Sequence, residues 1–169
     1  MGVKYLEKTI QLLTTITKYI ALSTMTFMML FIPFAVLSRL FFSPIVGDIE
    51  LVQLGMVVMI MCGLAYTQQV DGHITIEILA NKMSKRAQTI LDILGALLTF
   101  CVTLAFAYIY LEVAITHQND MRLTTNLLEI PFYPFDFIIV IGLFMWGLEA
   151  LLKFLRSCLL LFQSNSKES

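Results

Sequence analysis

The sequence predicts an all-α integral membrane protein with four transmembrane helices. Its 169 residues are 59% hydrophobic and 14% charged, whereas soluble domains carry about 25% charged and about 45–50% apolar residues. Four apolar stretches also match the roughly 20 residues that a helix needs to cross a hydrocarbon core of about 30 Å. The net charge of −1 gives no reason to expect nucleic acid as a partner. We therefore predict one membrane domain over residues 19–156.

The four spans follow one another along the chain. The apolar stretches are Tyr19–Ser38, Leu51–Val70, Ile93–Leu111 and Tyr133–Leu152. With flanking turns, the helices are expected at about residues 19–42, 49–70, 88–113 and 133–156. The first stretch exceeds the apolar region of a signal peptide, about 7–15 residues long, and no small-residue cleavage site follows it. It is therefore predicted to be a span.

The lysines and arginines predict the orientation of the spans. Nine of the eleven lie in the N-terminal segment, in the connection between the second and third spans, or at the C-terminus: Lys4, Lys8, Lys18, Lys82, Lys85, Arg86, Lys153, Arg156 and Lys167. Only Arg39 and Arg122 fall on the other side. Because cytoplasmic loops are enriched in these residues, both termini are predicted to be cytoplasmic. Residues 43–48 and 116–132 would then face outward.

Two amphipathic segments flank the spans. Residues 1–18 carry apolar positions among lysines and are predicted to form a surface segment. Between the second and third spans, a surface helix is expected at about residues 73–86, with Ile76, Leu79, Ala80 and Met83 on one face. A strand in "HITIEIL" is disfavoured because it would have no partner strand. Three cations of this helix are candidate contacts for lipid headgroups, namely Lys82, Lys85 and Arg86. Residues 157–169 are predicted to be a cytoplasmic tail.

The sequence offers little support for catalysis or metal binding. His73 and Glu77 would share a helix face, but a catalytic zinc site needs three protein ligands, and His117 is expected across the membrane. Asp71-Gly72 resembles the start of a phosphotransferase motif without its downstream aspartates. The three cysteines have no paired spacing and are predicted to be packing residues. We therefore predict no catalytic, metal, cofactor or substrate site.

Charged side chains are missing from the middle of the spans. The first three apolar stretches contain no Asp, Glu, Lys, Arg or His, and Asp136 and Glu149 lie toward the ends of the fourth. Proteins that transport polar solutes alone usually place such groups near the midplane. A supporting subunit needs only helices that pack, and the small residues that suit close helix approach are Gly55, Gly63, Ala65, Gly142 and Gly147. Trp146 lies well inside the last span and is predicted to be a packing residue. The alternative is a stand-alone channel, exporter or lipid-modifying enzyme.

Several motifs, in this order, resemble the small membrane subunit of tripartite ATP-independent periplasmic (TRAP) transporters. The order is "VLSRLFFSP", a glutamate that opens the second span, "GLAYTQQVDGHITIEIL" and "LLEIPFYPFDFIIVIGLF". The residues that match the family are Arg39, Pro44, Glu50, Gly63, Ala65, Gly72, His73, Ile74, Glu77, Ile130 and Pro131. The resemblance covers roughly residues 35–155 and includes four helices with a cytoplasmic N-terminus.

The resemblance implies a sodium-coupled transporter in the bacterial inner membrane. A periplasmic binding protein would deliver an organic acid, such as a C4-dicarboxylate or sialic acid, to a large multi-spanning subunit, and this chain would be its scaffold. Candidate partner-interface or structural residues are Arg39, Glu50, Gly63, Gly72, His73, Ile74, Glu77 and Ile78. Arg39 is expected either to pair with Asp48 or Glu50 or to extend to lipid headgroups. The outward loop with His117, Asp120, Arg122 and Glu129 is either solvated, which we favour, or in contact with the binding protein.

Overall fold

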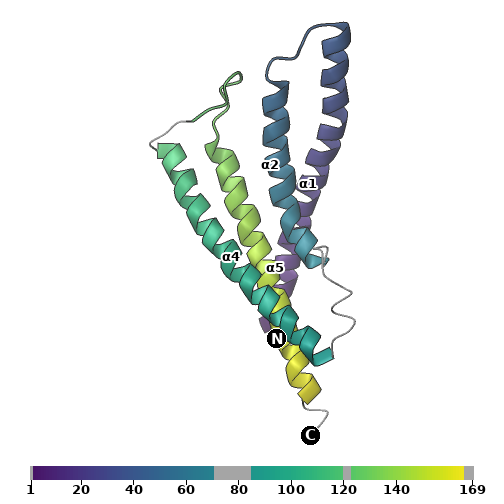
Figure 1. The fold of residues 1–169 in the computed structure, drawn as a ribbon, viewed down its shortest axis with the longest axis vertical. Coiled ribbons are helices and arrows are strands. Elements are labelled where there is room, and N and C mark those ends of the chain that lie inside the picture. Colours follow the sequence, from purple (N-terminus) through teal and green to yellow (C-terminus); the bar gives the residue numbers. More distant parts are fainter. Residues whose placement is uncertain (1, 71–84, 120–122, 166–169) are drawn as a thin grey trace.

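The computed structural model describes residues 2–70, 85–119 and 123–165, with side chains in 7–70, 87–119 and 123–159. These residues contain four α-helices, shown in Figure 1: α1 (Gly2–Phe41), α2 (Asp48–Gln69), α4 (Lys85–Asn119) and α5 (Tyr133–Asn165). Each includes a segment long and apolar enough to cross a membrane: Glu7–Phe41, Asp48–Gln69, Ala87–Asn119 and Tyr133–Leu159. The prediction of four membrane-spanning helices is confirmed by length and composition.

The helices run alternately up and down. α1 begins and α5 ends at one end of the bundle, here called the terminal end (Figure 1). Residues 42–47 and 123–132 lie at the opposite end, here called the loop end. α5 packs against both α4 and α2, while α1 packs mainly against α2 and has a smaller contact with α5. α5 is therefore the helix that joins the two halves of the bundle.

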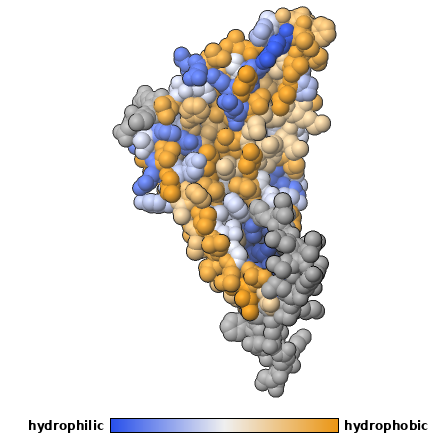
Figure 2. All heavy atoms as spheres, in the orientation of Figure 1, coloured by the Kyte–Doolittle hydropathy of each residue, from blue (hydrophilic) through white to orange (hydrophobic). Residues whose placement is uncertain are grey.

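α1 buries one narrow stripe of side chains and exposes the rest. Thr14, Ala21, Met28 and Ala35 are buried, and each is seven residues from the next. This is the spacing of a helix that packs at a shallow angle along its neighbour. Elsewhere α1 exposes bulky apolar side chains such as Met29 and Phe34. Figure 2 shows hydrophobic residues over most of the visible face of the molecule, as expected for a surface that contacts lipid or another membrane helix.

Small residues set the close approaches between helices. A Cβ added at Gly142 of α5 would lie 2.5 Å from the carbonyl oxygen of Met61 in α2. One added at Gly147 would lie 2.9 Å from Oγ1 of Thr103 in α4. Residues five apart on a helix point to different sides, so these two glycines serve different neighbours. α4 presents a matching buried row of small residues to the bundle, namely Ala96, Thr103, Ala107 and Ala114.

The helices extend further than the sequence predicted. α1 is one unbroken helix from Gly2, so residues 2–18 are continuous with the first span; their position at a membrane surface stays a prediction. α4 ends at Asn119, and α5 continues to Asn165 through residues predicted to be a tail. The segment around residues 157–165 contains no glycine or proline to end the helix. The predicted surface helix at 73–86 lies outside the described residues except for Lys85 and Arg86, which belong to α4.

Candidate functional site

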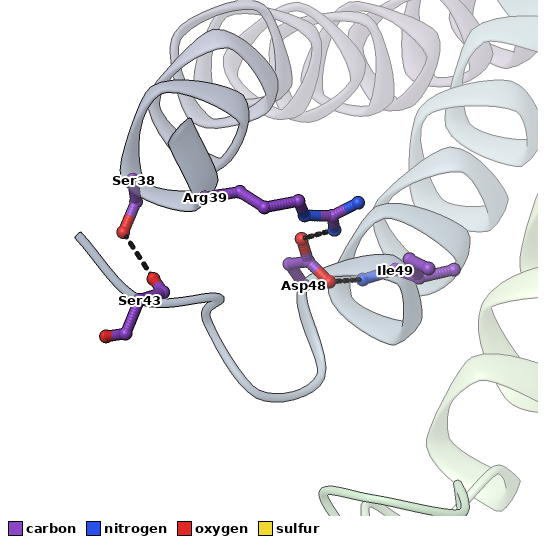
Figure 3. Close-up of polar contacts among 5 residues, drawn as sticks. All are labelled: Ser38, Arg39, Ser43, Asp48 and Ile49. Atoms are coloured by element: carbon purple, nitrogen blue, oxygen red, sulfur yellow. Dashed lines mark hydrogen bonds and ion pairs between the residues drawn. The ribbon is translucent and has the colours of Figure 1, made fainter. Parts of the chain in front are cut away.

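The α1–α2 connection at the loop end is fixed by an ion pair. Nη2 of Arg39 lies 2.6 Å from Oδ2 of Asp48 (Figure 3). The other carboxylate oxygen accepts the Ile49 backbone N–H at 2.8 Å, and the Ser38 hydroxyl donates to the carbonyl of Ser43. Asp48 begins α2, where the helix dipole favours a negative charge. Of the alternatives left open for Arg39, the structure has the ion pair with Asp48.

Glu50 has a different role from the one that its nearness to Arg39 suggested. Its two carboxylate oxygens accept the backbone N–H groups of Leu127 and Leu128, at 2.8 and 3.0 Å. These residues form a turn in the connection between α4 and α5. Glu50 therefore holds the connection between α4 and α5 onto the start of α2, and it bridges the two halves of the bundle at the loop end.

The loop that Glu50 holds is itself folded. Within residues 123–132, the Thr125 backbone N–H donates to the carbonyl of Ile130, and the Ile130 N–H donates to Oγ1 of Thr125. Gly47 has a φ of 77°, and a Cβ there would lie 2.3 Å from Leu128. Only glycine adopts such a φ without strain, so Gly47 permits both the turn into α2 and the contact with Leu128. Leu127 and Glu129 of this loop are exposed, and the choice between a solvated loop and one in contact with the binding protein stays a prediction.

A third contact at the loop end joins α4 to α5. Nδ1 of His117, near the end of α4, lies 2.7 Å from Oδ2 of Asp136 in the first turn of α5. Both side chains are largely buried. Across the part of the chain that the structure describes, no three His, Cys, Asp or Glu side chains are placed to hold a metal ion. The His117–Asp136 contact joins the end of α4 to the first turn of α5.

The terminal end is closed by contacts between α1 and α5. Oγ1 of Thr14 donates to Oε1 of Glu149 at 2.6 Å, and Glu149 is only 3% exposed. Seven residues away on each helix, Arg156 pairs with Glu7. Because α1 and α5 are antiparallel, one alignment of the two helices accounts for both contacts. The sequence placed Glu149 toward the end of a span and missed this role.

α2 is joined to both neighbouring helices near the terminal end. The ammonium of Lys18 in α1 lies 4.1 Å from the ring centroid of Tyr66, a distance at which a cation is attracted to the aromatic face. The indole N–H of Trp146 in α5 donates to Oε1 of Gln68 at 3.1 Å. Trp146, predicted to pack, thus also makes a polar contact with α2.

The structure brings only part of the predicted residue set together. Arg39 and Glu50 lie at the loop end, where Arg39 pairs with Asp48 and Glu50 lies in the same first turn of α2 as Asp48. Gly63 lies in α2, with its closest approach to Ala21 of α1, and is apart from that group. The remaining candidates are outside the described residues: Gly72, His73, Ile74, Glu77, Ile78 and Lys82. Lys85 and Arg86 are the first two residues of α4.

Comparison with known proteins identifies the family. The family model described as the DctQ component of tripartite ATP-independent periplasmic transporters matches residues 28–159. No curated protein gives a significant match to the chain. The matched range covers α2, α4, most of α5, about the last third of α1 and both connections at the loop end. Thr14 and Glu7, the α1 partners of Glu149 and Arg156, lie before it. This chain belongs to the DctQ family and is a small, multi-pass membrane component of a TRAP transporter.

Proposed function

We propose that this chain is the scaffold subunit of a sodium-coupled TRAP transporter for an organic acid and carries no transport site of its own. Its large partner would hold the sodium and substrate sites, and a periplasmic binding protein would deliver the substrate. The observation that carries the proposal is that the polar side chains bond to other parts of the same bundle. At both ends of the bundle they hold helices and loops together.

A transport path needs polar groups that can reach solute near the middle of the membrane. The central stretches of α1, α2 and α4 contain no charged residue. In α5, Glu149 is buried and bonded to Thr14, so it fastens one helix to another. These features favour a rigid bundle that supports another subunit over a carrier that changes its own polar pathway.

The family supplies the remaining parts of the proposal. Membership in the DctQ component of a tripartite system implies a large membrane subunit and a binding protein as partners. Sodium coupling, an organic acid substrate such as a C4-dicarboxylate or sialic acid, and location in the bacterial inner membrane follow from the family resemblance. The stand-alone channel, exporter or lipid-modifying enzyme is the competing account.

Purification in mild detergent separates these accounts. The tagged chain is purified from membranes that also contain the other transporter components, and the bound proteins are identified. A near-stoichiometric, multi-spanning subunit is expected to accompany it. A chain that purifies without such a subunit, and that moves solute or modifies lipid by itself in liposomes, would overturn the proposal.

A further inference from the structure

Tyr108 and Glu112 form a polar pair on the outer surface of α4. The Tyr108 hydroxyl and Oε1 of Glu112 are 3.0 Å apart. Tyr108 is 63% exposed, and Glu112 is also exposed. In the described parts of the chain, Arg39, His117 and Arg156 make their ion pairs with other carboxylates, and Glu112 makes no ion pair. The Glu112 carboxylate therefore has no cation beside it within these residues.

This pair belongs to a membrane-spanning segment. Both residues lie in the Ala87–Asn119 span, and Glu112 directly follows the charge-free stretch that ends at Leu111. In Figure 1, the loop ends of α4 and α5 lie lower along the long axis than those of α1 and α2. Ionisable residues in spans almost always face a bundle interior or a water-filled cavity and pair there. Glu112 instead faces outward from its own bundle.

The pair is one part of a longer exposed row on α4. Its members alternate in steps of three and four residues: Leu98, Cys101, Ala105, Tyr108, Glu112 and Ile115. We call this row the α4 outer stripe. It lies on the side of α4 opposite the buried row that includes Thr103 and Ala107. Steps of three and four are the spacing with which one helix packs along another at a shallow angle.

The outward side of α1 makes a useful contrast. Its exposed side chains are bulky and apolar, such as Met29 at 73% and Phe34 at 62% exposure. The apolar stretch of α1 contains no charged residue. Lipid tails satisfy such a surface. The α4 outer stripe instead combines the small Cys101 and Ala105 with a carboxylate, and small and polar residues are typical of contacts between membrane helices.

We propose that the α4 outer stripe is the docking surface for a transmembrane helix of the large TRAP subunit, and that this helix places an arginine or lysine beside Glu112. The inference rests on the proposed function, which supplies the partner. Charge complementarity specifies the partner's side chain. The hydrogen bond from Tyr108 holds the carboxylate on the stripe, in position for that cation.

The length of the stripe favours a helix over a lipid headgroup as the occupant. From Leu98 to Ile115 the stripe is roughly 26 Å long at about 1.5 Å per residue, which is close to the thickness of the hydrocarbon core. A headgroup would satisfy only Glu112 at one end. A partner helix satisfies the carboxylate and also covers the small residues below it.

Photocrosslinking tests the location of the interface. A benzophenone amino acid is introduced at Ala105, on the stripe, or at Met29, on the outward side of α1, in the chain coexpressed with the large subunit. Ala105 is expected to give a covalent adduct with the large subunit and Met29 to give none. Both positions are exposed in this chain, so the probe itself fits at either.

A charge substitution tests the chemistry of the contact. Glu112→Lys is expected to reduce the recovered large subunit by about three- to tenfold, the factor for one contact between membrane helices. Asp92→Lys is the matched control, because Asp92 is an exposed carboxylate on the same helix but off the stripe, and it should leave recovery unchanged. Exchanging the partner's cation for glutamate should restore recovery with Glu112→Lys.

The outcomes distinguish this inference from the proposed function. If the large subunit copurifies but crosslinks from Met29 and not from Ala105, the assignment of the α4 stripe is overturned and the scaffold role stands. Adducts from Ala105 only to lipid or to a second copy of this chain overturn it equally. If no large subunit copurifies with the unaltered chain, the proposed function itself fails. Should Glu112→Lys prevent insertion, the crosslinking result still decides.

Discussion

Thr14 and Glu149 are 135 positions apart in the sequence, yet the hydroxyl of one donates to the carboxylate of the other at 2.6 Å. Both side chains are buried, at 0% and 3% exposure. The bond fixes the register between α1 and α5, and the Glu7–Arg156 pair repeats that register seven residues further on. It also explains why a carboxylate can be retained inside an apolar bundle, since a buried polar group without a partner is costly.

Removing the Glu149 carboxylate should destabilise the bundle. Glu149→Ala leaves a void and an unpaired Thr14 hydroxyl, and we expect a loss of about 1–3 kcal/mol in the free energy of unfolding. Glu149→Gln keeps an oxygen that accepts from Thr14 and should cost less. Unfolding in detergent, followed by circular dichroism, measures both. Equal stability of Glu149→Ala and the unaltered chain would show that the bond does not hold α1.

Gly142 should tolerate no side chain. A Cβ there would lie 2.5 Å from the backbone oxygen of Met61, so Gly142→Ala must push α2 away from α5, at a cost of about 1–3 kcal/mol. Gly95 provides the matched control, because a Cβ there meets no atom within 4 Å. Gly95→Ala should be neutral or stabilising, since alanine favours helix by about 1 kcal/mol. Thermal unfolding of the two variants in the same detergent compares them, and similar shifts in both would contradict the predicted close approach.

Glu50 should stabilise the loop at residues 123–132. Glu50→Ala removes the acceptor for the Leu127 and Leu128 amides, so hydrogen exchange at both should become faster, by about tenfold for each 1.4 kcal/mol of lost protection. Glu129→Ala serves as the control, because Glu129 is exposed in the same loop. Unchanged exchange at Leu127 and Leu128 in Glu50→Ala would mean that the loop is held by other contacts.

Replacing Asp48 should destabilise the protein more than replacing Arg39. Arg39 is 54% exposed, while Asp48 is 12% exposed and also accepts the Ile49 amide. Arg39→Ala is expected to cost at most about 1 kcal/mol, as for other exposed ion pairs. Asp48→Ala removes both interactions and should cost more. Denaturation of the two variants measures the difference, and a larger loss for Arg39→Ala would contradict it.

The spans were predictable because crossing a membrane depends mainly on length and apolar content, which are local properties of the sequence. Helix ends were less predictable. Residues 157–165 are as compatible with helix as with a tail, and α5 continues through them. The continuity of α1 was missed for the same reason, because polar and apolar segments of one helix differ in composition and not in backbone structure.

The polar contacts were harder to predict because their partners are distant in the sequence. A pair between Arg39 and Asp48 was one of the alternatives that the sequence offered, since the two residues are only nine positions apart. Glu50 and Glu149 could not be assigned, because their partners are set by how α5 lies against α1 and α2. The glycines of α5 were also hard to interpret from the sequence. Gly142 and Gly147 are five residues apart because each allows a different neighbour, Met61 or Thr103, to approach α5.

Uptake by purified components tests the scaffold role most directly. Proteoliposomes are prepared with this chain alone, the large subunit alone, or both, and are supplied with the binding protein, a sodium gradient, and radiolabelled C4-dicarboxylate or sialic acid. Sodium-dependent uptake should require both membrane subunits, and this chain alone should give none. Uptake by this chain alone, or full uptake by the large subunit without it, would contradict the scaffold role.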